Sequence, residues 1–121
     1  MSAILKTPLS QSSYGQAISV GTTSSVGTLI HTANASATPG SGGTWDEIWL
    51  WGPNTSTGMI VLTVQFGATA ASNSIILSIP AQAGETLIVP GHILQNSGTV
   101  HAYAGTSGFV TVQGYVKLIT N

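Results

Sequence analysis

Short runs rich in Val, Ile, Thr and aromatic residues recur along the chain, separated by Gly, Ser, Asn and Pro. Runs of this kind, bounded by turn residues, are typical of β-strands. No segment keeps a helical apolar period for long enough to predict a helix. The pattern predicts eight strands, with a possible short one near His92–Leu94: Ala17–Val20, Val26–Thr32, Thr44–Trp51, Met59–Phe66, Ser74–Ile79, Glu85–Val89, Val100–Ala104 and Phe109–Ile119.

The last run shows the clearest alternation. Within Phe109–Ile119, Val112 and Val116 fall on one face, while Tyr115 and Lys117 fall on the other. A period of two with one apolar face predicts a half-buried antiparallel strand.

The fold class follows from the number and character of these runs. Both faces of Met59–Phe66 are largely apolar, so this strand is either central in a sandwich or covered by a neighbouring subunit. Short strands with regular turns predict an all-β, antiparallel two-sheet sandwich, of which an eight-stranded jelly roll fits best. An immunoglobulin-like sandwich is the alternative, but the chain lacks the Cys…Trp…Cys pattern.

Two segments fall outside the predicted strands. Residues 1–15 are predicted to form an extended N-terminal arm, because Ile4 and Leu5 need an apolar partner; a disordered terminus is the alternative. The sandwich domain then covers residues 16–121. Ala33–Gly43 is rich in Gly, Ser and Ala and is interpreted as a flexible loop.

Charge is scarce. Only 4% of residues are charged, against about 25% in a typical domain. A net charge near zero favours association, so we expect a homo-oligomer or a chain bound to a larger surface. Two cations cannot neutralise a phosphate backbone, which argues against nucleic-acid binding. The five charged residues are Lys6, Asp46, Glu47, Glu85 and Lys117.

Other classes of site and of location are also disfavoured. The chain has no cysteine, which excludes disulfides and thiolate metal sites. Met1–Gln16 lacks the apolar core of a signal peptide, and no apolar run is long enough for a membrane helix, so we expect synthesis in a cytoplasm and no membrane partner.

Candidate catalytic and metal-binding residues do not form a recognisable motif. His31, His92 and His101 have no local metal-ligand spacing. Asp46 and Glu47 are adjacent, so on a strand they point to opposite faces; we expect them to cap the strand or to pair with Lys6 or Lys117. No Gly-x-Ser-x-Gly motif is present, and a Glu85 carboxylate pair has no support from spacing. We therefore expect no enzyme activity, cofactor, metal or small-molecule substrate.

Aromatic residues gather in Thr44–Trp51. Trp45, Trp49 and Trp51 share one face with Glu47, whereas Ile48 and Leu50 take the other. The tryptophans could fill a core, form a subunit interface or stack against a sugar, and the sequence leaves these alternatives open.

The C-terminal half carries a resemblance to a known group of proteins. Leu77–Leu87 has the form strand, Ile-Pro-Ala, turn, Gly-Glu-Thr-Leu, and it continues through Pro90–Leu94 to Gly108–Ile119. Over Trp45–Thr120 this pattern resembles the jelly-roll decoration or cement proteins of tailed-bacteriophage capsids. The resemblance implies a non-enzymatic homotrimer on the surface of the virion head, bound between major capsid protein subunits and stabilising the shell.

We predict the contact residues from the arm and from the aromatic strands: Ile4, Leu5, Lys6, Trp45, Trp49 and Tyr115. Two alternative functions remain. One is a carbohydrate-binding, lectin-like domain, and the other is a tail, neck or fibre-associated domain of the same kind of particle.

Overall fold

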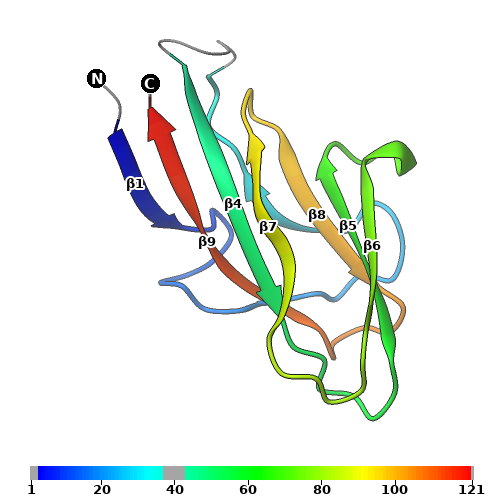
Figure 1. Ribbon diagram of the computed structural model, residues 1–121. Coiled ribbons are helices and arrows are strands. Elements are labelled where there is room, and N and C mark those ends of the chain that lie inside the picture. The colour runs from blue at the N-terminus through cyan, green and yellow to red at the C-terminus, as the bar shows by residue number, and fades with distance from the viewer. Residues whose placement is uncertain (1–2, 37–42, 121) are drawn as a thin grey trace.

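The computed structural model describes residues 3–36 and 43–120, and it is a sandwich of two antiparallel β-sheets (Figure 1). The five-stranded sheet has the order β1-β9-β4-β7, and β2 also pairs with β9. The four-stranded sheet has the order β3-β8-β5-β6. The strands are β1 (Ala3–Pro8), β2 (Ile18–Ser19), β3 (Thr28–Thr32), β4 (Thr44–Gly52), β5 (Ile60–Gly67), β6 (Ser74–Ile79), β7 (Thr86–Leu94), β8 (Thr99–Ala104) and β9 (Thr111–Thr120).

The predicted all-β sandwich is confirmed. Among the described residues the one helix is the 3₁₀ turn η1 (Ala71–Asn73), and no helix there has the length and apolar character needed to cross a membrane. Two strand predictions need correction. Glu85–Val89 and His92–Leu94 belong to a single strand, β7, and a further strand, β1, lies within the segment predicted as an arm.

The core lies between the sheets and is built by strand alternation. Ile48 and Leu50 of β4 and Val112 and Val116 of β9 point inward and are almost fully buried. They meet apolar side chains from β5 and β8, including Leu62, Val64 and Val100. Each such buried side chain contributes about 1.5–3 kcal/mol relative to exposure.

The N-terminal segment is extended, as expected of an arm, but it lies along the sandwich. Ala3 to Pro8 pair with Thr120 to Tyr115, so β1 is the edge strand beside β9. Leu9 follows directly and is 1% exposed in the core. As a result Ala3 and Thr120 are neighbours, and the start of β1 lies beside the end of β9 in Figure 1.

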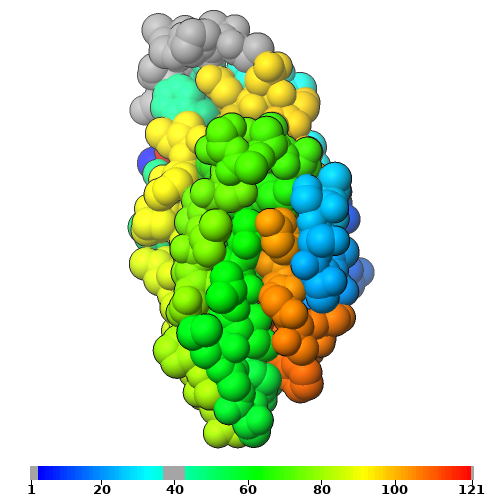
Figure 2. All heavy atoms as spheres, turned by 90° about the vertical axis from the view of Figure 1, so that its right-hand side faces the viewer, coloured from blue at the N-terminus to red at the C-terminus, as the bar shows by residue number. Residues whose placement is uncertain are grey.

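The outer face of the four-stranded sheet is partly covered by the chain itself. The segment before β3 buries Gln65 on this face and satisfies its amide group. Gly27 N–H donates to Gln65 Oε1 at 2.9 Å, and Gln65 Nε2 donates to Ser25 Oγ at 2.8 Å. Figure 2 views this face, with the blue segment before β3 lying beside β8 in orange. The strand β5, predicted to be either central or covered, lies between β8 and β6.

Candidate functional site

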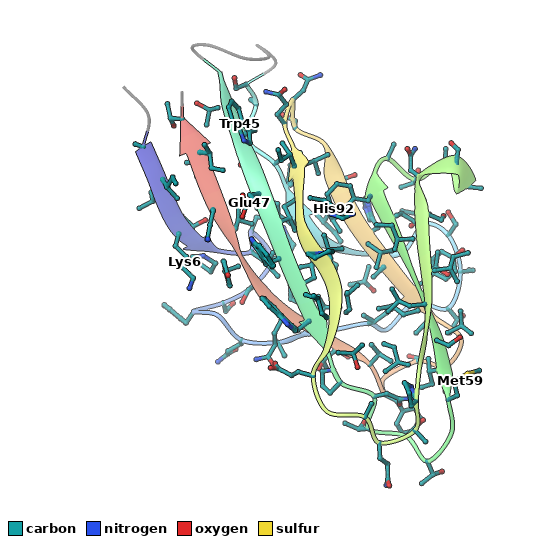
Figure 3. All side chains as sticks on the ribbon, in the orientation of Figure 1. Lys6, Trp45, Glu47, Met59 and His92 are labelled. Atoms are coloured by element: carbon teal, nitrogen blue, oxygen red, sulfur yellow. The ribbon has the colours of Figure 1, made fainter. Side chains whose placement is uncertain are left out.

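The outer face of the five-stranded sheet brings together side chains from four strands, which line up in rows across the sheet. Lys6 on β1 lies opposite Lys117 on β9, and Lys117 lies opposite Glu47 on β4. In the next row Tyr115 lies opposite Trp49. Figure 3 labels Lys6 and Glu47 on this sheet. We call this surface the aromatic face.

Apolar side chains extend the aromatic face on both sides of these rows. Ile4 lies opposite Ile119, which lies opposite Trp45. On β7, Leu87 and Ile93 are the register partners of Trp51 and Glu47. Ile4, Leu87 and Ile93 are 68%, 47% and 59% exposed, so apolar surface reaches both edges of the sheet.

Three rings form the centre of the aromatic face. The ring centroids of Trp49 and Trp51 are 6.0 Å apart with an interplanar angle of 15°. Tyr115 lies 6.3 Å from Trp49 and 5.8 Å from Trp51. Aromatic pairs at these separations stabilise one another beyond their buried area. The cluster is therefore held together before any partner binds.

Charged groups border the rings. The Lys6 ammonium nitrogen lies 4.1 Å from the Tyr115 ring centroid, and that of Lys117 lies 6.0 Å from the Trp49 centroid, both within the range of cation–π attraction. Trp49 Nε1–H donates a hydrogen bond of 2.7 Å to Glu47 Oε1. This bond fixes the orientation of the indole at the centre of the aromatic face.

Two glycines allow the backbone to approach Trp49. Gly91 of β7 has φ +80°, and a Cβ there would lie 2.8 Å from Trp49 Cζ2. At Gly114 of β9 a Cβ would lie 1.9 Å from the Trp49 carbonyl oxygen. Any other residue at either position would displace β4 or the indole.

Five of the six predicted contact residues share the aromatic face: Ile4, Lys6, Trp45, Trp49 and Tyr115. Leu5 does not, because strand alternation turns it to the other side of β1, opposite Leu118. The tryptophans lie outside the core between the sheets, so a core-filling role for them is wrong. Whether the six residues contact a partner stays a prediction.

The aromatic face has members beyond the predicted contact residues. Alternation already places Trp51 with Trp45 and Trp49, and Lys117 with Tyr115, so both could have been included. Leu87 and Ile93 could not, because two register shifts along β7 interrupt the alternation, so that Leu87 is exposed while Val89, two positions later, is buried.

Apart from the aromatic face, a buried polar cluster forms around Asp46. Asp46 Oδ2 is 2.6 Å from His31 Nε2, and Asp46 Oδ1 accepts a hydrogen bond of 2.7 Å from Asn34 Nδ2. Ser10 N–H donates to His31 Nδ1 at 2.9 Å, so the proton of the neutral ring is on Nε2 and points at Asp46. The expected pairing of Asp46 or Glu47 with a lysine of the same chain is therefore wrong. Asp46 bonds His31 and Asn34, and Glu47 accepts a hydrogen bond from Trp49.

The residue types of this cluster are those of a Ser–His–Asp triad, but the arrangement differs. Ser10 meets the ring through its backbone N–H, and its Oγ accepts a hydrogen bond from Thr32 N–H at 2.8 Å. His31 is 5% exposed. The cluster therefore ties the residues after β1 to β3 and β4, which is a structural role.

The charge of Asp46 is stabilised by these partners. Burial by itself would raise the pKa of the carboxyl group, but the hydrogen bonds from His31 and Asn34 outweigh burial and hold the pKa below its usual value of 3.8. Within residues 3–36 and 43–120, no three His, Asp or Glu side chains come together as a metal site.

No family model matches the chain, and neither the curated proteins nor the solved structures include a match to it.

Proposed function

We propose that the chain is a structural virion protein, a decoration or cement protein that binds the major capsid protein of a tailed-phage head through the aromatic face. The observation that carries this proposal is the aromatic face itself, where the three-ring cluster and exposed apolar residues on β1 and β7 lie on either side of the charged row Lys6–Lys117–Glu47. Exposed apolar side chains gathered on one face and bordered by polar groups mark interaction sites. Trp and Tyr are also the residues that most often dominate binding energy.

The phage assignment depends on the resemblance of Trp45–Thr120 to small capsid decoration proteins. The strand order supports it. From β2 to β9 each strand lies in the other sheet from the one before it, except that β5 and β6 are neighbours, and β1-β9-β4-β7 faces β3-β8-β5-β6. We assign this order to a jelly roll, the body that the resemblance implies. A shell-binding role of this kind is carried by surface contacts and needs no catalytic group.

The test uses heads of the phage that encodes the chain, stripped of this protein. Wild-type chain should bind them saturably in a sedimentation assay. Tyr115→Ala should weaken binding by roughly 10-fold or more, as expected for a hot-spot tyrosine. Tyr14→Ala is the matched control, because Tyr14 is 100% exposed and lies outside the aromatic face.

Two results would count against the proposal. Failure of wild-type chain to bind heads would overturn the capsid assignment. Equal binding by Tyr115→Ala and Tyr14→Ala, with both variants folded, would move the contact away from the aromatic face.

A carbohydrate-binding function is the second candidate, and the three-ring cluster favours it. Polarised C–H groups of a sugar can pack on the negative face of an aromatic ring. Against it, the Lys6 ammonium already lies over Tyr115. Titration of monosaccharides with tryptophan fluorescence tests this candidate: a saturable quench that is lost in Trp49→Ala would favour the sugar.

A further inference from the structure

The two cations of the chain are direct neighbours. The sequence of 121 residues contains two lysines, Lys6 and Lys117, and no arginine. The two lysines are Cα partners in the pairing of β1 with β9. Like charges directly opposite one another on a sheet are destabilising. The fold therefore keeps two positive charges together at a cost to its own stability.

One carboxylate, Glu47, lies opposite Lys117 on β4 and offsets part of this repulsion. Each ammonium group lies near an aromatic ring, Tyr115 for Lys6 and Trp49 for Lys117. Neither lysine has a carboxylate oxygen within 4.0 Å in the part of the chain that is described, where the one such pair is His31 with Asp46. Both ammonium groups thus retain hydrogen-bonding capacity for an incoming anion.

The distribution of charge indicates what this anion belongs to. The row Lys6–Lys117–Glu47 on β1, β9 and β4 has a net charge of +1, whereas Asp46 is buried and Glu85 precedes β7, outside this row. A second copy docked face to face would bring two positively charged surfaces together. An acidic surface on a different protein complements the aromatic face better.

We infer that the Lys6–Lys117 pair receives a carboxylate from an Asp or Glu side chain on the partner protein. This inference rests on the proposed docking of the aromatic face. One carboxylate offers two oxygens, one for each ammonium group, in charge-assisted hydrogen bonds. The three-ring cluster beside the lysines packs against the apolar surface around that carboxylate, which excludes water from the ion pair.

The experiment measures binding to the stripped heads over a range of NaCl concentrations. The double variant Lys6→Gln, Lys117→Gln should bind roughly 10-fold more weakly than wild type at low salt. Wild-type binding should weaken by several-fold between low and moderate salt, because two charges are screened, whereas binding of the double variant should hardly change.

Three controls accompany the double variant. Lys6→Arg, Lys117→Arg keeps the charges and should bind and respond to salt like wild type. Glu85→Gln changes a charge that precedes β7, outside the cross-strand row of the two lysines, and should bind like wild type. The thermal midpoint and light-scattering mass of each variant establish that it is folded and in the wild-type assembly state.

The outcomes separate the two proposals. If wild type binds heads and the folded double variant binds equally with the same salt dependence, the carboxylate inference is overturned and the proposed function stands. If the double variant instead changes the mass of the protein in solution, the lysines contact a second copy and the inference is also overturned. If wild type does not bind heads, the proposed function fails and takes the inference with it.

Discussion

Asp46 is the one buried side-chain carboxylate within residues 3–36 and 43–120, and both of its oxygens accept hydrogen bonds. One oxygen meets His31 Nε2 and the other accepts from Asn34 Nδ2. Because His31 also accepts from Ser10 N–H, the pair links three separate segments. A buried charge is tolerated only when it is paired and hydrogen-bonded in this way.

Asp46→Asn should therefore lower the free energy of unfolding by about 2–3 kcal/mol, because the new amide NH₂ would face a donor on His31 or Asn34. Glu85→Gln makes the same chemical change at an exposed position and should cost less than about 0.5 kcal/mol. Urea unfolding of both variants checks this, and equal costs would contradict the structural role of Asp46.

The lowered pKa of Asp46 also predicts a pH dependence. Because the pKa is lower in the folded state than in the unfolded state, its stabilisation is present above about pH 4 and is lost as the pH falls through the folded-state value. Asp46→Asn should lack this acid-dependent loss. The measurement is the urea midpoint from pH 6 to pH 2; parallel curves for the two proteins would show that other groups dominate.

Gly114 lies where β9 has no room for a side chain beside β4. Gly114→Ala should destabilise the protein by about 2–3 kcal/mol, because its Cβ would collide with the Trp49 carbonyl oxygen. Gly21→Ala is the control, since a Cβ at Gly21 has nothing within 4 Å. Thermal unfolding distinguishes the two, and a neutral Gly114→Ala would mean that β4 and β9 can move apart.

At the level of elements, β1 is an exposed edge strand that is followed directly by a buried residue, Leu9. Its side chains are mostly exposed, and Lys6 and Pro8 are residues that commonly protect sheet edges. Leu9, immediately after it, is in the core. The segment is therefore held at its C-terminal end by burial and along its length by hydrogen bonds to β9.

Leu9→Ala should cost about 2.5–5 kcal/mol, in the range of other core leucines. Leu5→Ala, four positions earlier in the same segment, should be within about 0.5 kcal/mol of wild type because Leu5 is 59% exposed. Chemical unfolding tests the pair. Equal small effects would mean that the whole segment is detachable, as an independent arm would be.

Most strands could be predicted from alternation, because a period of two is a local property of the sequence. The inward Ile48 and Leu50 and the outward tryptophans follow from it directly. The pairing of β1 with β9 could not be predicted, since it joins opposite ends of the sequence and residues 3–8 contain no clear alternation. The His31–Asp46 contact was missed for a similar reason: it depends on how β3 and β4 meet across two sheets.

At the scale of the whole molecule, apolar surface remains on both sheets. Besides the aromatic face, Met59 and Ile76 are 60% and 67% exposed on or beside the four-stranded sheet, and β6 is an uncharged edge strand. Such an edge pairs readily with another chain unless it is covered. This arrangement is what we expect of the homo-oligomer predicted from the scarcity of charge, in which copies of the chain would cover surfaces that the aromatic face does not use.

Light scattering coupled to size exclusion should therefore give a trimer of about 37 kDa, three times the mass of the 12.3 kDa chain. Ile76→Lys, which places a charge on β6, should shift the protein toward monomer if this edge lies in the trimer interface. A wild-type monomer at high protein concentration would contradict the trimer.

The pairing of Ala3 with Thr120 has a practical consequence for labelling. A fluorescent protein or affinity tag attached directly before Ala3 or directly after Thr120 would start at the same corner, next to Ile4, Ile119 and Trp45. There it would obstruct the surface whose binding is to be measured. The exposed turn Gly105–Gly108, at the other end of β9, is a better place for a small dye or a short epitope.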